Sequence, residues 1–285
     1  GHGYRPASSR GWAGMMLEDK TGRKINYLRV SVTDRCNLRC EYCMPPEGVE
    51  QKDHGDMLSY EEIVEVVGGA VRLGIFKVRL TGGEPLVRKG VTGLVRQLRG
   101  ITGLKEISMT TNGILLTPDV AAKLKDAGLD RLNISLDTLD PARYRELTRV
   151  GEVADVINGI AVAQAAGFEG TKINMVVTLP GSREDIEMMK LFCAREGLVL
   201  QTINRFSLSK RTCDTESPHL DRPLPCEKCN RLRLTSDGFL KPCLFSDVEI
   251  KVDFRDIEGS IRKAVEAKPD KGTSCSERSM KQIGG

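Results

Sequence analysis

Short apolar runs alternate with longer amphipathic stretches along the chain from about Lys24 onward. The short runs are rich in Val, Ile and Leu, as buried strands are, and the longer stretches repeat their apolar residues at helical spacing. This alternation is typical of βα units, whose strands form a parallel sheet. It predicts strands at residues 27–32, 77–80, 106–110, 131–135, 172–177 and 198–203.

Helices are expected between these strands, at residues 59–73, 91–98, 118–127, 153–166 and 183–196. Ser59 followed by Glu62 is a capping-box pattern at the start of the first helix. Such βα units can close most of a TIM-type barrel, in which the chemistry lies at the C-terminal ends of the strands. The predicted fold class is α/β, with a partial (βα)6 TIM-type barrel over residues 21–206 and a disordered N-terminal segment or tag over residues 1–20.

The rhythm breaks after Phe206 into a stretch that contains Ser, Pro and Cys, which predicts a second module over residues 207–285. The composition, 40% apolar and 29% charged over 285 residues, is that of an ordinary globular protein. A net charge of +4 does not indicate a nucleic-acid partner, and the chain has no apolar run of about 18 residues that could span a membrane. We expect a cytoplasmic protein, and the sequence leaves a homodimer open.

Six of the nine cysteines form two triplets, and three is the wrong number for paired disulfides. Cys36, Cys40 and Cys43 follow the first strand with the spacing C-x3-C-x2-C. A loop this short can bind three irons of a [4Fe–4S] cube and leave the fourth iron open to another ligand. The alternative is a structural zinc ion, which normally takes four ligands, and His54 is the nearby residue that could serve as the fourth.

The second triplet, Cys226, Cys229 and Cys243, has the spacing C-x2-C-x13-C and predicts a second cluster with an open iron. A zinc ribbon remains the alternative, although it would call for another C-x2-C pair. The other cysteines stand alone and are expected to be buried or incidental thiols; they are Cys193, Cys213 and Cys275.

The first triplet, together with Thr-Gly-Gly-Glu-Pro at residues 81–85 after the second strand, resembles the radical S-adenosylmethionine superfamily. The resemblance implies a cluster whose open iron binds S-adenosylmethionine and cleaves it to a 5′-deoxyadenosyl radical, so that the cofactor supplies the chemistry. It also implies an electron donor such as flavodoxin or ferredoxin. The residues that match cofactor contacts of the superfamily are Tyr42, Gly82, Gly83, Glu84 and Ser135.

Residues 229–238 and 242–246, around the second triplet, resemble one subfamily, the GTP 3′,8-cyclases of molybdenum cofactor biosynthesis. These enzymes convert GTP to (8S)-3′,8-cyclo-7,8-dihydroguanosine 5′-triphosphate, and their second cluster holds the guanine. Basic residues within barrel strands are unexpected unless an anion meets them. Positions matching the subfamily's GTP contacts are Arg29, Arg79, Thr110, Lys172, Arg231 and Arg233, and Lys77 and Arg205 are added as substrate-binding candidates.

The chain ends with Gly284-Gly285, which local physics alone would assign to a frayed terminus. The subfamily has the same ending, which reaches into its active site. The resemblance therefore gives a catalytic set of Arg231, Arg233, Gly284 and Gly285.

One stretch departs from the subfamily. After Arg205 the subfamily usually continues with an acidic, methionine-containing stretch and a further length of chain, whereas this sequence arrives at Cys226 soon afterwards. Two alternatives therefore stay open. One is a radical enzyme with an auxiliary cluster that acts on a different nucleotide or on a peptide, and the other is a non-catalytic metal-binding scaffold.

Overall fold

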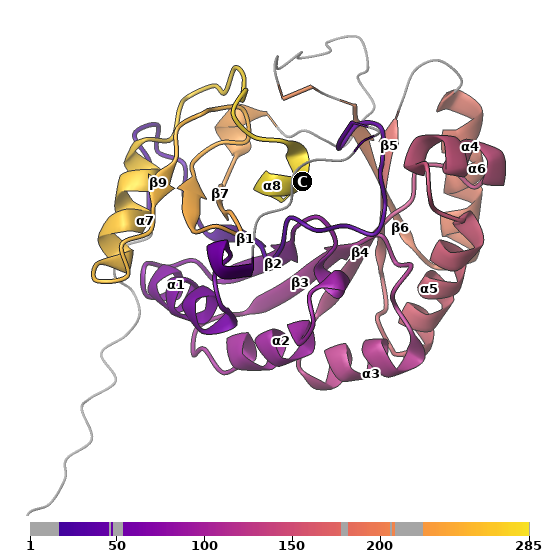
Figure 1. Ribbon diagram of the computed structural model, residues 1–285, viewed down its shortest axis with the longest axis horizontal. Coiled ribbons are helices and arrows are strands. Elements are labelled where there is room, and N and C mark those ends of the chain that lie inside the picture. Colours follow the sequence, from indigo (N-terminus) through magenta and orange to yellow (C-terminus); the bar gives the residue numbers. More distant parts are fainter. Residues whose placement is uncertain are drawn as a thin grey trace, which may run out of the picture.

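Parallel strands form the first part of the fold in the computed structural model, which describes residues 17–45, 47, 54–177, 182–205, 207–208 and 225–284. The sheet order is β6-β5-β4-β3-β2-β1, and the sheet curves into an open barrel (Figure 1). Every predicted strand is present and differs from its predicted range by at most a residue at either end. The strands are β1 (Tyr27–Ser31), β2 (Lys77–Thr81), β3 (Glu106–Thr111), β4 (Arg131–Ser135), β5 (Lys172–Val177) and β6 (Val199–Asn204).

The predicted helices are also present, and they cover the outside of the curved sheet (Figure 1). Their bounds are α1 (Tyr60–Arg72), α2 (Val91–Arg99), α3 (Pro118–Asp126), α5 (Val153–Ala165) and α6 (Ser182–Arg195). The capping box at Ser59 and Glu62 is confirmed, since each side chain accepts a hydrogen bond from the other residue's backbone N–H.

One barrel helix, α4 (Pro141–Thr148), was not predicted. Its sequence carries few apolar residues, so it lacks the periodic apolar stripe by which the other helices are found. The described residues also contain three short 3₁₀ turns, namely η1 (His54–Asp56), η2 (Pro85–Val87) and η3 (Cys226–Lys228).

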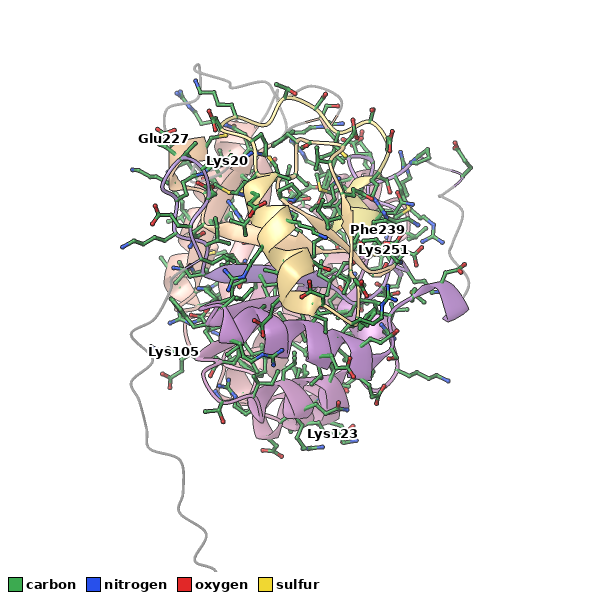
Figure 2. The ribbon with its side chains drawn as sticks, turned by 90° about the vertical axis from the view of Figure 1, so that its left-hand side faces the viewer. Lys20, Lys105, Lys123, Glu227, Phe239 and Lys251 are labelled. Carbon is green, nitrogen blue, oxygen red and sulfur yellow. The ribbon has the colours of Figure 1, made fainter. Side chains whose placement is uncertain are left out.

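The C-terminal segment continues the barrel sheet instead of forming a separate layer. Strand β7 (Arg231–Leu234) pairs in parallel with β1, and β8 (Phe239–Lys241) and β9 (Ile250–Lys251) follow antiparallel, which gives a nine-stranded sheet. Lys251 lies over the ring of Phe239 at 4.5 Å (Figure 2). The segment therefore shares its hydrogen-bonded framework with the barrel.

Two further helices join this segment to the barrel. Helix α7 (Ile257–Glu266) lies beside α1 (Figure 1), and Arg72 Nε meets Glu258 Oε1 at 2.6 Å. Helix α8 (Met280–Ile283) brings the C-terminal end of the chain to the middle of the barrel opening (Figure 1).

The N-terminal boundary needs one correction. Leu17 is buried in the core, Asp19 Oδ2 pairs with Arg23 Nε at 2.6 Å, and Glu18 forms a β-bridge with Lys24. The predicted disordered leader is therefore wrong for residues 17–20, while residues 1–16 lie outside the described part of the chain. None of the helices in the described ranges has the length and apolar character that crossing a membrane would demand.

Two helical glycines give a matched test of this packing. In α5, a Cβ at Gly159 would lie 2.2 Å from the carbonyl oxygen of Gly113, whereas in α2 a Cβ at Gly93 would meet nothing within 4 Å. We expect Gly159→Ala to lower the free energy of unfolding by about 1–3 kcal/mol through overpacking. Gly93→Ala should raise it by roughly 0.5–1 kcal/mol, since Ala favours helix. Urea unfolding of both variants measures this, and a shift of the same sign in both would contradict the packing of α5 against the turn after β3.

Candidate active site

The inside of the barrel holds one cavity of about 510 Å³. It is lined by every predicted site residue that the structure describes, apart from Gly284. These residues are Arg29, Cys36, Cys40, Tyr42, Cys43, Lys77, Arg79, Gly82, Gly83, Glu84, Thr110, Ser135, Lys172, Arg205, Cys226, Cys229, Arg231, Arg233 and Cys243. The predicted constellation is thus brought together from both ends of the chain.

The two cysteine triplets lie at opposite ends of the barrel strands. Cys36 comes after the C-terminal end of β1, whereas Cys229 precedes β7, which runs parallel to β1 with Tyr27 opposite Arg231. Cys243 follows β8, which runs back antiparallel, so it returns to the end where Cys229 lies. The expectation that all the chemistry lies at the C-terminal ends of the strands therefore holds for the first triplet only.

The first triplet consists of free, half-buried thiols. Burial and the neighbouring Cys36 raise the pKa of Cys43 to about 12, and burial with the neighbouring Cys43 raises the pKa of Cys40 well above its usual value. Thiolates that are crowded in this way need a cation to offset their charge, and metal binding deprotonates such ligands. In the described ranges no three His, Cys, Asp or Glu side chains gather so as to hold a metal ion. A [4Fe–4S] cube does not require them to meet at one point, since each cysteine binds a different iron.

The Gly82-Gly83 turn lies directly against the loop that leads to Cys36. A Cβ at Gly82 would lie 2.4 Å from the carbonyl oxygen of Thr33, and one at Gly83 would lie 2.2 Å from that of Arg35. The backbone N–H of Gly83 donates to the Thr33 carbonyl at 2.8 Å. Only residues without side chains allow the two backbones to approach this closely.

Glu84 is buried, and its carboxylate joins two neighbouring turns. It accepts hydrogen bonds from Leu86 N at 3.0 Å, from Thr111 Oγ1 at 2.7 Å and from Asn112 N at 2.7 Å. Burial raises the pKa of Glu84 to about 7 despite these donors. The carboxylate thus ties the turn after β2 to the turn after β3, while a direct contact with a cofactor remains a prediction.

Tyr42 anchors the cysteine loop to the opposite side of the barrel. Its hydroxyl donates to Asp137 Oδ2 at 2.7 Å, and Asp137 Oδ1 accepts from Val176 N at 2.8 Å. Burial raises the pKa of Asp137 to about 6. Asp137 was missed in the sequence because its partners come from distant segments.

The second triplet lies in a positively charged setting. Burial alone would raise the pKa of Cys229, but Lys268 and Arg231 lower it to about 7, which favours the thiolate. Lys268 is itself buried, and its Nζ donates to the carbonyl oxygens of Arg231 at 2.9 Å and Pro242 at 2.6 Å. It therefore ties together the two backbone segments that carry Cys229 and Cys243.

Three arginines on neighbouring strands lie at one level of the barrel. In the strand register Arg29 is paired with Arg79 on β2 and with Arg233 on β7. Burial, and then the charge of Arg233, holds the pKa of Arg29 well below its usual value, and burial lowers that of Arg233 to about 10. Guanidinium groups that are desolvated and mutually repelling favour a multiply charged anion such as a phosphate chain.

Tyr27 lies beside this arginine row and was not predicted. Lys77 Nζ lies 5.6 Å and Arg79 Cζ 5.7 Å from the centroid of its ring. The spacing of two residues between Tyr27 and Arg29 places both side chains on the same face of β1, so that alternation could have revealed it.

Two of the predicted substrate-binding residues form ion pairs within the protein. Lys77 Nζ lies 2.8 Å from Glu106 Oε1, and Arg205 Nη1 lies 3.0 Å from Glu41 Oε1. The buried hydroxyl of Thr110 finds no hydrogen-bond partner among the described residues. It is therefore the member of this group that is most in need of a ligand.

The tail enters the barrel, as predicted. Arg233 Nη1 donates to the carbonyl oxygen of Gly284 at 2.7 Å. Gly284 has φ 77°, and a Cβ there would lie 2.4 Å from Thr81 Oγ1. Gly285 lies outside the described residues.

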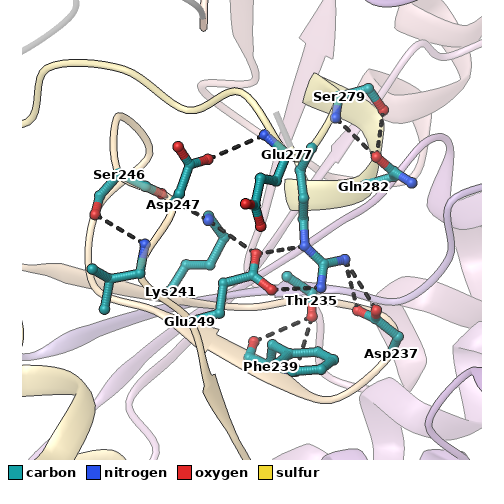
Figure 3. Close-up of polar contacts among 12 residues, drawn as sticks. Thr235, Asp237, Phe239, Lys241, Ser246, Asp247, Glu249, Glu277, Ser279 and Gln282 are labelled. Atoms are coloured by element: carbon teal, nitrogen blue, oxygen red, sulfur yellow. Dashed lines mark hydrogen bonds and ion pairs between the residues drawn. The ribbon is translucent and has the colours of Figure 1, made fainter.

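A buried ion-pair network fixes the chain just before this tail (Figure 3). Arg278 Nη1 lies 3.0 Å from Asp237 Oδ2, and its Nη2 donates to Glu249 Oε2 at 2.7 Å. Lys241 Nζ lies 3.0 Å from the same glutamate. A capping box at Ser279 then starts α8, so the direction of the tail is set by the network and the cap together.

Comparison with known proteins fits this arrangement. Residues 30–193 match the family model of the radical SAM superfamily. Two solved structures share the fold: SuiB from Streptococcus suis bound to S-adenosylmethionine, and anSMEcpe with bound AdoMet. SuiB has a TM-score of 0.66 and 16% sequence identity, and the match covers 86% of this chain and 64% of SuiB. For anSMEcpe the TM-score is 0.62 and the sequence identity 17%, and the match covers 86% of this chain and 81% of anSMEcpe. The chain belongs to the radical SAM superfamily, whose members bind a [4Fe–4S] cluster and S-adenosylmethionine.

Sequence relatives narrow the family further. The GTP 3′,8-cyclase of Peptoclostridium acidaminophilum is 44% identical over 290 residues, covering 87% of each chain. That of Petrotoga mobilis is 40% identical over 324 residues, covering 94% of this chain and 99% of its own. The chain belongs to the GTP 3′,8-cyclase family. Because 285 residues cannot fill 324 aligned positions, the second relative carries residues inside the matched region that this chain lacks.

The seating of the tail can be tested without any cofactor. In Gly284→Ala the new Cβ would collide with Thr81, and a positive φ costs a non-glycine residue roughly 1–2 kcal/mol. We expect the tail to leave the barrel, so that trypsin cleaves after the buried Lys281 about tenfold faster, in line with about 1.4 kcal/mol per factor of ten. Gly22→Ala is the control, since it has a similar φ of 79° but more open surroundings. Unchanged cleavage after Lys281 in Gly284→Ala would refute the seating.

Proposed function

We propose that this protein is a cytoplasmic GTP 3′,8-cyclase, which converts GTP to (8S)-3′,8-cyclo-7,8-dihydroguanosine 5′-triphosphate as the first step of molybdenum cofactor biosynthesis. The observation that carries the proposal is the placement of two cysteine triplets at opposite ends of one cavity, with the row Arg29, Arg79 and Arg233 between them. The names of its relatives support the same substrate. A cavity with three such regions suits a ligand that has a base, a sugar and a phosphate chain.

In this proposal Cys36, Cys40 and Cys43 hold one [4Fe–4S] cluster, and the second triplet holds another. Three thiolates per cube leave one iron open at each end of the cavity. When bound, the first cluster and S-adenosylmethionine, with an electron from flavodoxin or ferredoxin, supply a 5′-deoxyadenosyl radical. The chain itself binds the cofactor and the substrate, orients their reacting atoms and excludes water.

The cofactor side of the cavity is built by the loop and turns at the C-terminal ends of the strands. Gly82 and Gly83 leave their backbone open to the amino group of S-adenosylmethionine, and Ser135 at the end of β4 lines the same cavity. Tyr42, fixed by Asp137, presents its backbone to the adenine. Because each of these groups is held by a neighbouring strand, the reactive carbon can be aimed within a narrow range.

The substrate side is built by the arginine row and its neighbours. The phosphate chain of GTP would relieve the mutual repulsion of Arg29, Arg79 and Arg233, with Lys172 and Thr110 as further contacts. The guanine would reach the open iron near Cys229. Between these two fixed ends the ribose lies within the barrel, where the Gly284 carbonyl holds the Arg233 guanidinium in place.

A second candidate is a paralogue that acts on another nucleotide or on a peptide. It is favoured by the residues that relatives carry and this chain lacks, which we place in the short connection after Arg205. The two candidates differ in whether 5′-deoxyadenosine formation depends on GTP. Anaerobic turnover with GTP labelled with deuterium at C3′ distinguishes them, since only the cyclase transfers that deuterium into 5′-deoxyadenosine.

Replacing Cys36, Cys40 and Cys43 by Ala should lower iron from about eight to about four per chain, because each triplet suits one cube. The same variant should form no 5′-deoxyadenosine. Iron analysis and product chromatography after anaerobic reconstitution measure both. Cys193→Ala, a buried thiol away from the cavity, is the control that should keep all the iron. Cleavage of S-adenosylmethionine by the triple variant would contradict the assignment of the first cluster to these three cysteines.

Arg79→Ala should separate substrate conversion from cofactor cleavage. Its phosphate contact positions the reacting carbon from a distance, so we expect conversion of GTP to fall about 10²-fold while GTP-independent formation of 5′-deoxyadenosine stays nearly unchanged. Arg195→Ala, an exposed arginine on α6, should change neither rate. An equal loss of both activities in Arg79→Ala would instead show a structural role.

A further inference from the structure

Arg149, at the C-terminal end of α4, has the only positive φ among the described non-glycine residues, with φ 66° and ψ −30°. Helices often end with a residue at positive φ, usually Gly and sometimes Asn in the left-handed helical region, but the negative ψ of Arg149 lies outside that region. Such a conformation is unfavourable for a residue that has a side chain. Residues held in this way persist where the surrounding structure requires them, and they gather at functional sites.

The side chain of Arg149 binds the first cysteine loop on both sides of the segment from Cys40 to Cys43. Its Nη1 donates to the carbonyl oxygen of Arg39 at 2.8 Å and to that of Met44 at 2.9 Å. These two residues lie immediately outside Cys40 and Cys43. One guanidinium nitrogen thus spans the segment that contains two of the three thiols.

The backbone at the end of α4 contacts the same loop. The Thr148 carbonyl accepts from Arg39 N at 3.1 Å, and the Leu147 carbonyl accepts from Glu41 N at 3.0 Å. The last carbonyls of a helix lack partners within the helix, so the cysteine loop supplies them. A Cβ at Gly151 would lie 2.7 Å from Leu38 Cδ2, which shows that the following turn packs on the loop as well.

We propose that Arg149 and the last turn of α4 are the device that holds the Cys40–Cys43 segment in its ligand-binding shape, with Arg149 as a positioning residue for the first cluster. The inference rests on the cluster role proposed for the first triplet. The segment belongs to no strand or helix, so its backbone groups need partners from elsewhere. Fixing those groups in advance removes part of the conformational entropy cost of ordering the loop from cluster binding.

The choice of arginine follows from this role. A glycine at position 149 would relieve the backbone but could not reach the carbonyls of Arg39 and Met44. The residue present carries the backbone strain and supplies the two hydrogen bonds. The side chain, and not the helix end alone, is therefore the functional feature.

The test measures how fast each cluster loses iron. Reconstituted protein is mixed anaerobically with an iron chelator, and release is recorded for the intact chain and for the variant with Cys36, Cys40 and Cys43 replaced by Ala. The difference between the two traces is release from the first cluster. In Arg149→Gly this phase should be about tenfold faster, since hydrogen bonds from a charged donor are lost, while release from the second cluster is unchanged.

Two further variants make the result specific. Arg149→Lys keeps a cationic donor on a long stem and should stay within about threefold of the intact chain. Arg145→Ala, one turn earlier on α4 with an exposed side chain paired to Glu152, should change neither phase. Unchanged release in Arg149→Gly, or the same acceleration in Arg145→Ala, overturns the proposal. Circular dichroism of the iron-free variants must show intact helices, and a collapse in Arg149→Gly that Arg149→Lys does not rescue also counts against it.

If the first triplet does not hold a cluster at all, the iron measurements give a different result. If the first-triplet variant binds as much iron as the intact chain, no first-cluster phase exists. That result overturns the cluster role of the triplet itself, and with it the role of Arg149.

Discussion

The strand register of β1 is the constraint on which the site depends. Pairing β1 with β2 on one side and β7 on the other sets Arg79, Arg29 and Arg233 side by side inside the barrel. Burying neighbouring guanidinium groups opposes folding. The opposite faces of these strands offset that cost, since Leu28, Val30, Leu80 and other apolar side chains are fully buried against the helices. The sheet is therefore stabilised from its outer face, and the inner face is left free to be polar.

A polar interior allows both ends of the barrel to contribute residues to one site. In a barrel filled with branched apolar side chains, chemistry is confined to the loops at one end. Here the cavity reaches both ends of the strands, so the loop after β1 and the segments before β7 and after β8 can all contact one ligand. The tail adds a contact from within, because Arg278 and its acidic partners direct Gly284 to Arg233. Segments far apart in sequence thus surround a single volume.

The parts of this arrangement with a local sequence signal were predictable. Strand periodicity, cysteine spacing and the alternation of Arg29 or Arg79 with apolar neighbours each leave a local trace. Helix α4 has a start signal in Asp140 and Pro141 but no apolar stripe, and its end is completed by backbone donors from the cysteine loop more than a hundred residues earlier. Buried Glu84, Asp137 and Lys268 were unpredictable in their structural roles for the same reason, since their partners come from other segments. Likewise the pairing of β7 with β1 has no local signal, because four residues say little about which strand they join.

The sheet order also shows which part of the chain the first cysteine loop depends on. The sheet is open between β6 and β9, and β6 and β7, although successive in the chain, lie six strand positions apart. The connection between them therefore begins at one edge of the described sheet and ends beside β1. The elements that hold the first cysteine loop, namely α4, the turn after β2 and Asp137, all precede that connection. A difference in chain length after β6 therefore leaves every contact described for that loop in place.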